Sequence, residues 1–521
     1  MSWFQPAQPM LPDILRNNAE QRASQAAVIC GDTKLSWQAF HTDLNRVANA
    51  LRNEGLENGD RVAILMQNSV EMLEAMLGVM CAGLVAVPLN VSVSDEGIEK
   101  QINNCDARAV IASDEHTARI EAMRKRLPAH IDNRLIAAPA ARDGWLHLDA
   151  LMRKASETPP NVSISPQQPC NIIYSSGTTG LPKGIVHSYA CRMAWAYNMS
   201  IALRYHCDTR ALISLGLYSN ITWVTLLSAI LCGGTLVLMP AFDVVSCLQL
   251  IERERISHSS MVPVQFQRLL ASPDFNDFDL SSIEALMCCG SPLHADLKQE
   301  IVSRIPGDFI ELYGLTEGLV TTQSPIEAAS NPRSVGRPCP GQSLKILDGN
   351  DQPLPAGESG EIVGHGDLLM SGYLNRDEAN AEATWKDEHG RTWLRTGDIG
   401  RLDEDGNLYL VDRKKDMIIS GGQNIYPADI ESVIAQNNDV FEVAVVGVRS
   451  ERWGEAPIAV VTGDAIDTEA LLQWTNERVG RQQKIAAVAI VDELPRNPNG
   501  KVLKRKLRVQ FADILDKQVA D

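Results

Sequence analysis

The 521-residue sequence lacks an excess of basic residues, because 48 Lys and Arg face 65 Asp and Glu and the formal net charge is −17. A nucleic-acid-binding surface needs a basic face, so this balance argues against one, although an anionic ligand needs only local donors. The eleven cysteines include no CxxC pair, and the adjacent Cys288 and Cys289 do not form the spaced pairs of a zinc site. We therefore expect free thiols in a reducing compartment.

Recognisable targeting signals are also missing. The first ten residues, MSWFQPAQPM, have no basic segment followed by an apolar one, and the last six, DKQVAD, match no peroxisomal or prenylation signal. We expect a cytoplasmic protein. Residues 211–240 contain no Asp, Glu, Lys or Arg and are long enough to span a bilayer. Because Gly216, Asn220 and the pair Gly233–Gly234 interrupt this stretch, we predict a buried strand–helix–strand unit instead.

The length predicts two or more domains. Apolar strand patterns and helical patterns alternate through the first half, which predicts layered parallel α/β structure. From about Pro332, Gly and Pro become frequent and short strands are expected. We predict an α/β N-terminal domain over residues 1–411, with a β-rich subdomain at about 332–411, a boundary at 412–416 and a small α+β C-terminal domain over 417–521.

The stretch YSSGTTGLPKG, residues 174–184, is rich in glycine and hydroxyl side chains. It is not a Walker A loop, because its second glycine comes too early and Lys183 is followed by Gly184. Its ingredients still suit phosphate: glycines allow close backbone approach, consecutive N–H groups can form an anion nest, and Lys183 adds a point charge. The alternative is a surface loop without a ligand.

Four further motifs follow in order: ELYGLTEG, RTGDIG, DRKKDMIISGGQNIYP and PRNPNGKVLKRKLR. With the first loop, this series resembles the adenylate-forming superfamily of acyl- and aryl-CoA synthetases, peptide-synthetase adenylation domains and beetle luciferases. The resemblance covers nearly the whole chain. It implies that a carboxylate attacks the α-phosphorus of ATP, and that a thiol, most often that of CoA, then displaces AMP from the acyl-adenylate.

The resemblance also assigns roles to residues of the nucleotide site. Glu317 is the implied Mg²⁺ ligand, Thr316 reaches a phosphate, and Lys501 approaches the α-phosphate and the carboxylate during the first half-reaction. A single carboxylate completed by ATP oxygens and water suits this hard cation. The remaining implied ATP-binding residues are Ser175, Ser176, Thr178, Thr179, Lys183, Gly290, Ser291, Pro292, Glu311, Leu312, Tyr313, Gly314, Asp398 and Arg413.

The second half-reaction involves other residues. Lys415 is the implied hinge about which the small domain rotates, a hinge-type transition. The implied CoA-binding residues are Gly421, Gly422, Trp453 and Lys484. For Trp453 a place in the hydrophobic core is an equal alternative. Apart from Lys501, the basic run made of Lys504, Arg505, Lys506 and Arg508 is predicted to be a solvated face rather than a localisation signal.

The segment LGLYSNITW departs from the relatives. Tyr218 stands in place of a His, and Asn220 and Trp223 complete the implied wall of the acyl pocket. The segment lacks the Asp that pairs with an amino acid's ammonium group, and Ile419 replaces the Lys of luciferases. A stand-alone, AMP-forming acyl- or aryl-CoA synthetase is therefore favoured, acting on an aromatic or medium-length acid.

Two alternatives stay open: a ligase that loads a separate carrier protein, and a non-catalytic protein on the same fold. The implied partners are a small carboxylic acid, ATP and CoA, with no nucleic acid and no membrane span, and a homodimer is left open.

Overall fold

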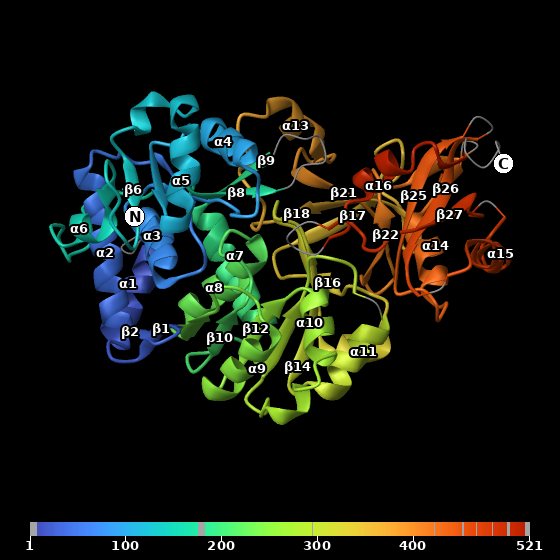
Figure 1. Cartoon of the computed structure of the whole chain (residues 1–521), viewed down its shortest axis with the longest axis horizontal. Coiled ribbons are helices and arrows are strands. Elements are labelled where there is room, and N and C mark those ends of the chain that lie inside the picture. Colours follow the sequence, from blue (N-terminus) through green and yellow to red (C-terminus); the bar gives the residue numbers. More distant parts are fainter. Residues whose placement is uncertain are drawn as a thin grey trace. The chain divides into compact units, whose positions relative to one another are not determined.

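The computed structural model describes residues 8–175, 183–293, 295–420, 423–450, 453–464, 466–481, 483–496 and 501–515. The chain divides into two compact units, drawn in Figure 1 in the colours of the sequence. The first unit holds the described residues within 1–332, 338–343 and 365–384, and the second those within 333–337, 344–364 and 385–521. The predicted α/β class is confirmed. Most of the predicted β-rich segment groups with the C-terminal residues, and the boundary at 412–416 stays a prediction.

The first unit contains two sheets that are parallel in their centres. The first sheet has the order β15-β14-β13-β12-β10-β11-β1-β2, and the second has the order β19-β9-β8-β4-β3-β5-β6-β7. Ligands of such sheets bind beyond the carboxyl ends of the parallel strands. The strands of the first sheet are β1 (Ala26–Cys30), β2 (Thr33–Ser36), β10 (Arg210–Ile213), β11 (Thr235–Leu238), β12 (His258–Met261), β13 (Ala285–Cys288), β14 (Asp308–Gly314) and β15 (Val320–Gln323). Those of the second are β3 (Arg61–Leu65), β4 (Val85–Pro88), β5 (Ala109–Ala112), β6 (Leu135–Ala137), β7 (Leu146–His147), β8 (Pro169–Ser175), β9 (Lys183–Ser188) and β19 (Gly372–Tyr373).

Helices cover both sheets of this unit (Figure 1). They are α1 (Leu11–Gln21), α2 (Trp37–Asn53), α3 (Val70–Cys81), α4 (Asp95–Asn104), α5 (Asp114–Met123), α6 (Leu148–Met152), α7 (Tyr189–Ala202), α8 (Asn220–Cys232), α9 (Val244–Arg253), α10 (Pro263–Leu270), α11 (Ala295–Arg304), α12 (Pro325–Ser330) and α13 (Asp377–Glu382). Helix α3 contacts β3 and β4 of one sheet and β1 of the other, and all its residues except Glu71 are buried. It is buried on nearly all sides because it has a sheet on more than one side, and its sequence is mostly apolar apart from Glu71 and Glu74.

The uncharged stretch 211–240 contains β10, α8 and β11, as predicted. Helix α8 is almost entirely buried and ends at Gly233, whose φ of 74° closes it in the left-handed conformation that glycine adopts readily. Within the described part of the chain, no helix has the length and apolar character needed to cross a membrane.

The second unit also has two sheets. In the first, the order is β17-β18-β21-β20 and β22 pairs with β21; in the second, it is β24-β23-β26-β25 and β27 pairs with β26. The two-residue strand β16 (Arg337–Pro338) lies where the residue ranges of the two units meet. The other strands are β17 (Ser343–Leu347), β18 (Gly360–His365), β20 (Thr384–Lys386), β21 (Thr392–Leu402), β22 (Leu408–Arg413), β23 (Ile418–Ser420), β24 (Gln423–Ile425), β25 (Glu442–Ser450), β26 (Gly454–Thr462) and β27 (Ala487–Ile490).

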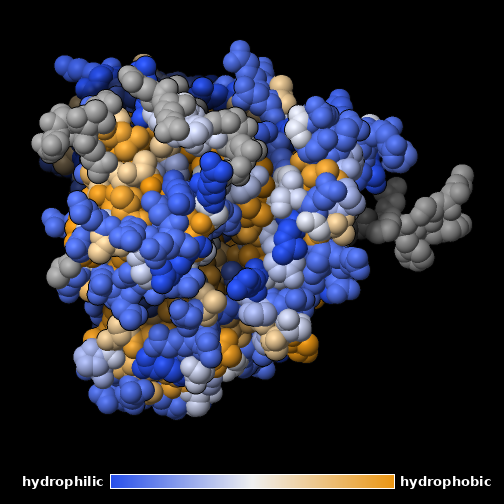
Figure 2. Space-filling view, turned by 90° about the vertical axis from the view of Figure 1, so that its right-hand side faces the viewer, coloured by the Kyte–Doolittle hydropathy of each residue, from blue (hydrophilic) through white to orange (hydrophobic). Residues whose placement is uncertain are grey.

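Both faces of the C-terminal sheet are covered. Its helices are α14 (Pro427–Ile434), α15 (Thr468–Arg478) and α16 (Lys504–Gln510). Alternate residues of β25 face opposite ways: Val445 packs with α14 and α15, whereas Val446 packs with Leu507 of α16. The result is the α+β arrangement that the sequence predicts. On the face drawn in Figure 2, hydrophilic residues predominate and hydrophobic ones show between them.

Candidate active site

The phosphate-loop motif connects two antiparallel strands of the first unit. Ser175 ends β8 and pairs with Lys183 at the start of β9, so these two residues stand at the base of the motif. Strand β8 runs parallel to β4, which places its end at the carboxyl edge of the sheet. Ser176, Thr178 and Thr179 lie outside the described residues.

The ELYGLTEG motif forms a hairpin. Residues 311–314 of β14 pair with 320–323 of β15, and Leu315 closes the turn by donating its N–H to the Leu319 carbonyl. Gly318 has φ 118°, and a Cβ there would lie 2.0 Å from the Leu368 carbonyl oxygen. Only glycine fits this approach. Glu317 is therefore carried on a turn, not on a helix face.

The first two residues of the ELYGLTEG motif are held inside the unit. Leu312 is buried, and Glu311 accepts a hydrogen bond of 2.7 Å from the buried Lys298 ammonium on α11. Burial raises the pKa of Glu311, and Lys298 opposes this rise. In this structure Glu311 is thus engaged inside the unit, Tyr313 is partly exposed and Gly314 is exposed.

Tyr373 links two predicted site residues. Its hydroxyl donates to Glu317 Oε1 over 2.9 Å, and the Lys183 Nζ lies 4.5 Å from the centroid of its ring. The Glu317 carbonyl also accepts the Met370 N–H. The structure therefore brings Lys183 and Glu317 together through a residue that sequence reasoning missed.

Glu317 suits a hard cation. Tyr373 donates to one of its carboxylate oxygens, and the second oxygen can serve as a metal ligand. Among the described residues, no group of three or more His, Cys, Asp or Glu could hold a metal ion. A cation here would take its other ligands from ATP phosphates and water, as magnesium does in many nucleotide sites.

The residues after β13 approach the start of α8. Gly290 has φ 95°, and a Cβ there would lie 2.8 Å from Ile221 Cδ1. The partly buried Ser291 and the exposed Pro292 follow it. Tyr218 precedes α8, and its ring lies so close to Gly216 that a Cβ on that residue would be 2.2 Å from Tyr218 Cε1. Segment 290–292 and the predicted acyl wall are therefore neighbours within one unit.

Behind this wall lies a buried cation, Arg192 on α7. Its guanidinium donates to Asn220 Oδ1 over 2.8 Å and stacks on Trp223, with 4.5 Å from Cζ to the ring centroid. It also donates to Asn171 and to His187 Nδ1, and His187 Nε2 lies 2.8 Å from the Thr316 carbonyl. Trp223 is fully buried, so this side chain supports the wall from behind.

Burial lowers the pKa of Arg192 to about 10. Burial and the nearby Arg192 hold the pKa of His187 well below its usual range. His187 is therefore neutral at pH 7. Its Nε2–H donates to the Thr316 carbonyl, and its Nδ1 accepts a hydrogen bond from Arg192. Sequence reasoning missed both residues, although the HSYACR segment follows the phosphate loop directly.

In the second unit, Asp398 and Arg413 face each other on paired strands. They are partners in the register of β21 and β22, and Arg413 Nε lies 3.3 Å from Asp398 Oδ1. The Asp398 side chain is 7% exposed and that of Arg413 is 37% exposed. The Asp398 N–H donates to Thr396 Oγ1, which fixes the backbone of the TGD turn.

Lys501 lies in the same electrostatic cluster. Burial, then Arg413 and Lys415, lowers its pKa to about 7, and Asp398 and Asp416 act in the opposite direction. Burial and Arg413 likewise lower the pKa of Lys415. The structure thus gathers the four predicted residues Asp398, Arg413, Lys415 and Lys501, with cations in excess.

The basic residues of α16 do not all form a solvated face, which corrects the prediction made for Lys504 and Arg508. Lys504 Nζ lies 2.7 Å from Glu431 Oε1, and Arg508 lies 3.0 Å from Asp416. These two side chains turn inward from α16 and form ion pairs, whereas Arg505 and Lys506 are exposed as predicted.

Of the predicted CoA-binding residues, Trp453 directly precedes β26 and is 50% exposed. The alternative of a tryptophan in the hydrophobic core is therefore wrong. Lys484 is also exposed. Gly421 and Gly422 lie outside the described residues.

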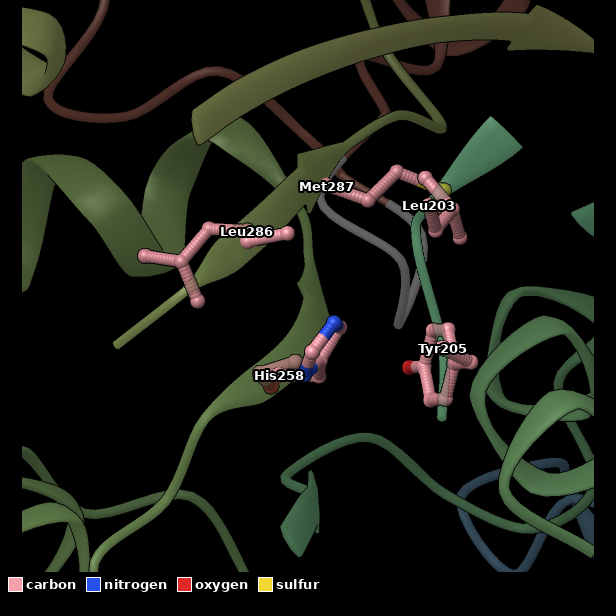
Figure 3. Close-up of a pocket in the computed structure, with 7 residues that line it drawn as sticks. Leu203, Tyr205, His258, Leu286 and Met287 are labelled. Atoms are coloured by element: carbon pink, nitrogen blue, oxygen red, sulfur yellow. The ribbon is translucent and has the colours of Figure 1, made fainter. Parts of the chain in front are cut away.

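A small cavity at the other edge of the first sheet is not part of this site. Figure 3 shows Tyr205 and His258 side by side, and their ring centroids are 4.5 Å apart. His258 begins β12, and Ala285, which also lines the cavity, begins β13, so the cavity is at the amino ends of the parallel strands. Burial lowers the pKa of His258 to about 4, which keeps it neutral at pH 7.

The comparisons with known proteins decide the family. The family model of AMP-binding enzymes matches residues 15–374, and that of the AMP-binding enzyme C-terminal domain matches residues 429–501. The chain belongs to the AMP-binding enzymes. As a member of this family it is an AMP-forming acid–thiol ligase, and the predicted acyl- or aryl-CoA synthetase activity is confirmed.

Three proteins illustrate its similarity to other AMP-binding enzymes. The feruloyl-CoA synthase of an Amycolatopsis species is 34% identical over 93% of this chain and 96% of its own length. The indoleacetate–CoA ligase of Aromatoleum aromaticum is 34% identical over 96% of this chain and 97% of its own. The ATP-bound crystal structure of MatB from Rhodopseudomonas palustris matches with a TM-score of 0.88 and 28% identity, over 97% of this chain and 99% of that one.

Proposed function

We propose that this AMP-binding enzyme activates an aromatic carboxylic acid as its acyl-adenylate, with Mg·ATP, and transfers the acyl group to CoA. The observation that carries the choice of acid is the wall at the start of α8. There the Tyr218 ring packs on Gly216, beside Ile221 and the 290–292 segment. A planar ring packs well against another aromatic ring. The feruloyl-CoA synthase and the indoleacetate–CoA ligase, both named for acids with an aromatic ring, support the same class.

In the first half-reaction, the carboxylate oxygen attacks the α-phosphorus and pyrophosphate leaves. Lys183, Ser175, Ser176, Thr178 and Thr179 hold the phosphates, and Glu317 would hold the magnesium ion. Asp398 accepts from the ribose hydroxyls, because its two oxygens suit a vicinal diol. Lys501 stabilises the charge on the α-phosphate in the transition state. Such preorganised electrostatic stabilisation is the main contribution in phosphoryl chemistry.

In the second half-reaction, the CoA thiolate attacks the acyl carbon and AMP leaves with the bonding electrons. The half-exposed Trp453 indole offers a stacking surface for the adenine of CoA, and the exposed Lys484 offers a charge for its phosphates. The predicted hinge at Lys415 belongs to this proposal.

The test is pyrophosphate release over a panel of acids, with AMP measured in the presence and absence of CoA. We expect hydroxycinnamic and arylacetic acids to exceed straight-chain acids of equal carbon number by at least about tenfold in pyrophosphate release, the scale of one buried methylene group. Faster turnover of straight-chain acids would overturn the choice of acid. Adenylate formation that CoA never accelerates would favour a carrier protein as the acceptor.

A further inference from the structure

The segment that carries Tyr373 is fastened to the strand that begins with Lys183. Strand β19 pairs with β9, with Tyr373 opposite Ile185. The Ser371 and Leu374 N–H groups donate to the carbonyls of Val186 and Gly184, each over 2.8 Å. The Tyr373 backbone therefore moves together with the strand that leaves the phosphate loop.

A second set of bonds fixes the same residue from α13. Asn380 Oδ1 accepts the Tyr373 N–H over 2.7 Å, and Asn380 Nδ2 donates to the Tyr373 carbonyl over 3.0 Å. Tyr373 is 9% exposed. The backbone N–H and carbonyl of Tyr373 are thus both hydrogen-bonded to one amide side chain, which fixes the backbone from which the phenol projects.

The phenol makes two different contacts from this position. Its hydroxyl donates to Glu317 Oε1, and its ring face carries the Lys183 ammonium. A phenol that donates to one oxygen of a carboxylate orients the other oxygen without competing for it. A cation over the ring gains electrostatic stabilisation without a carboxylate that would neutralise it. Lys183 can therefore face a phosphate, and the second oxygen of Glu317 can face a cation.

We propose that Tyr373 is a positioning residue, which orients Glu317 toward the magnesium ion of Mg·ATP and holds Lys183 over its ring beside the same nucleotide. This inference rests on the proposed function, because it takes Glu317 as the metal ligand. The alternative is that Tyr373 only fills space between β9 and the ELYGLTEG turn. The two differ in one respect: only a positioning role couples the hydroxyl to magnesium.

The test compares Tyr373→Phe with the wild type by calorimetric titration of ATP, with saturating magnesium and with EDTA. The phenylalanine keeps the ring under Lys183 and removes only the hydrogen bond. We expect the affinity for Mg·ATP to fall about 3- to 10-fold, the scale of one ordinary lost hydrogen bond, and that for metal-free ATP to stay unchanged. The half-saturating magnesium concentration for pyrophosphate release should rise by the same factor. Conversion of supplied acyl-adenylate with CoA should not change.

Tyr409→Phe is a matched control, because the Tyr409 hydroxyl donates to Asp403 Oδ2 over 3.1 Å in a surface hairpin of the second unit. It should leave both affinities for ATP unchanged. Tyr373→Leu removes the ring as well, and should also weaken the binding of metal-free ATP because Lys183 loses its support. Thermal unfolding of each variant shows that it is folded.

Equal losses with and without magnesium in Tyr373→Phe, or no loss in either, would overturn the positioning role. If the wild type releases no pyrophosphate with any acid, the proposed function fails. If the wild type is active and its ATP binding does not depend on magnesium, the assignment of Glu317 fails, and the role of Tyr373 fails with it.

Discussion

The two units hold their charged site residues in opposite ways. In the first unit, Glu317 and Lys183 each contact the neutral Tyr373 through a hydrogen bond and a ring face. In the second, Lys501, Lys415 and Arg413 lie near Asp398 and Asp416, and burial, followed by the two neighbouring cations, lowers the pKa of Lys501. The first arrangement orients a carboxylate and an ammonium through one uncharged side chain, whereas the second places three cations near two carboxylates.

The largest effect should come from removing the ammonium group of Lys501. Lys501→Ala should slow acyl-adenylate formation about 10²- to 10³-fold, the scale for losing one preorganised donor to a transition state. Conversion of supplied acyl-adenylate with CoA should persist. Single-turnover assays of each half-reaction measure both, and Lys506→Ala, which removes an exposed lysine of α16, is the control. Adenylation at the wild-type rate in Lys501→Ala would contradict the role given to the second unit.

The next effect tests the rigid scaffold of the first unit. Gly318→Ala puts a Cβ 2.0 Å from the Leu368 carbonyl at φ 118°, so the turn that carries Glu317 must shift. We expect a loss of about 2–4 kcal/mol in the free energy of unfolding, as for other strained backbone positions. Gly406→Ala has a similar positive φ, 79°, but nothing within 4 Å, and should cost about 1 kcal/mol. Chemical denaturation distinguishes the two, and equal losses would show that the close approach is unimportant.

Many of the site residues in both units were predicted from the sequence, but the contacts that hold them in place were not. The chemistry of the glycine-rich loop pointed to Lys183, and the resemblance to the adenylate-forming superfamily implied Glu317, Asp398, Arg413 and Lys501. Local patterns also predicted the strand–helix–strand unit at 211–240. These features depend on residues that are close together along the chain.

Long-range contacts were missed. Tyr373 meets Glu317 across 56 positions, and Arg192 meets Asn220 across 28, so no local pattern indicates either contact. The ion pairs of α16 were missed for the same reason: a basic run is typical of a solvated face, and only the fold brings Glu431 and Asp416 to it.

A smaller effect follows from the lowered pKa of Lys501, which is about 7. The ammonium form is the one that stabilises phosphate charge, and it is lost as pH rises through this pKa. The kcat/KM for adenylation reports the free enzyme, so it should fall above about pH 7 by up to tenfold per pH unit. Lys501→Arg stays charged and should move this alkaline limb out of the measured range, even if its maximal rate is lower. An unchanged limb in Lys501→Arg would assign it to another group.

The smallest effect concerns the ion pair between Lys504 of α16 and Glu431 of α14. Lys504 and Glu431 have side chains 16% and 20% exposed, and Lys504 also lowers the pKa of Asp412, which burial raises. Lys504→Met keeps the apolar stem but leaves two half-buried carboxylates without their cation, so we expect a loss of about 1 kcal/mol in the free energy of unfolding. Lys506→Met, on the exposed side of α16, should cost nothing measurable. Burial raises the pKa of Asp412, and this carboxyl no longer needs Lys504 once it is protonated. The difference between these variants should therefore shrink in acid, and a difference that persists there would mean that packing, not charge, holds α16 in place.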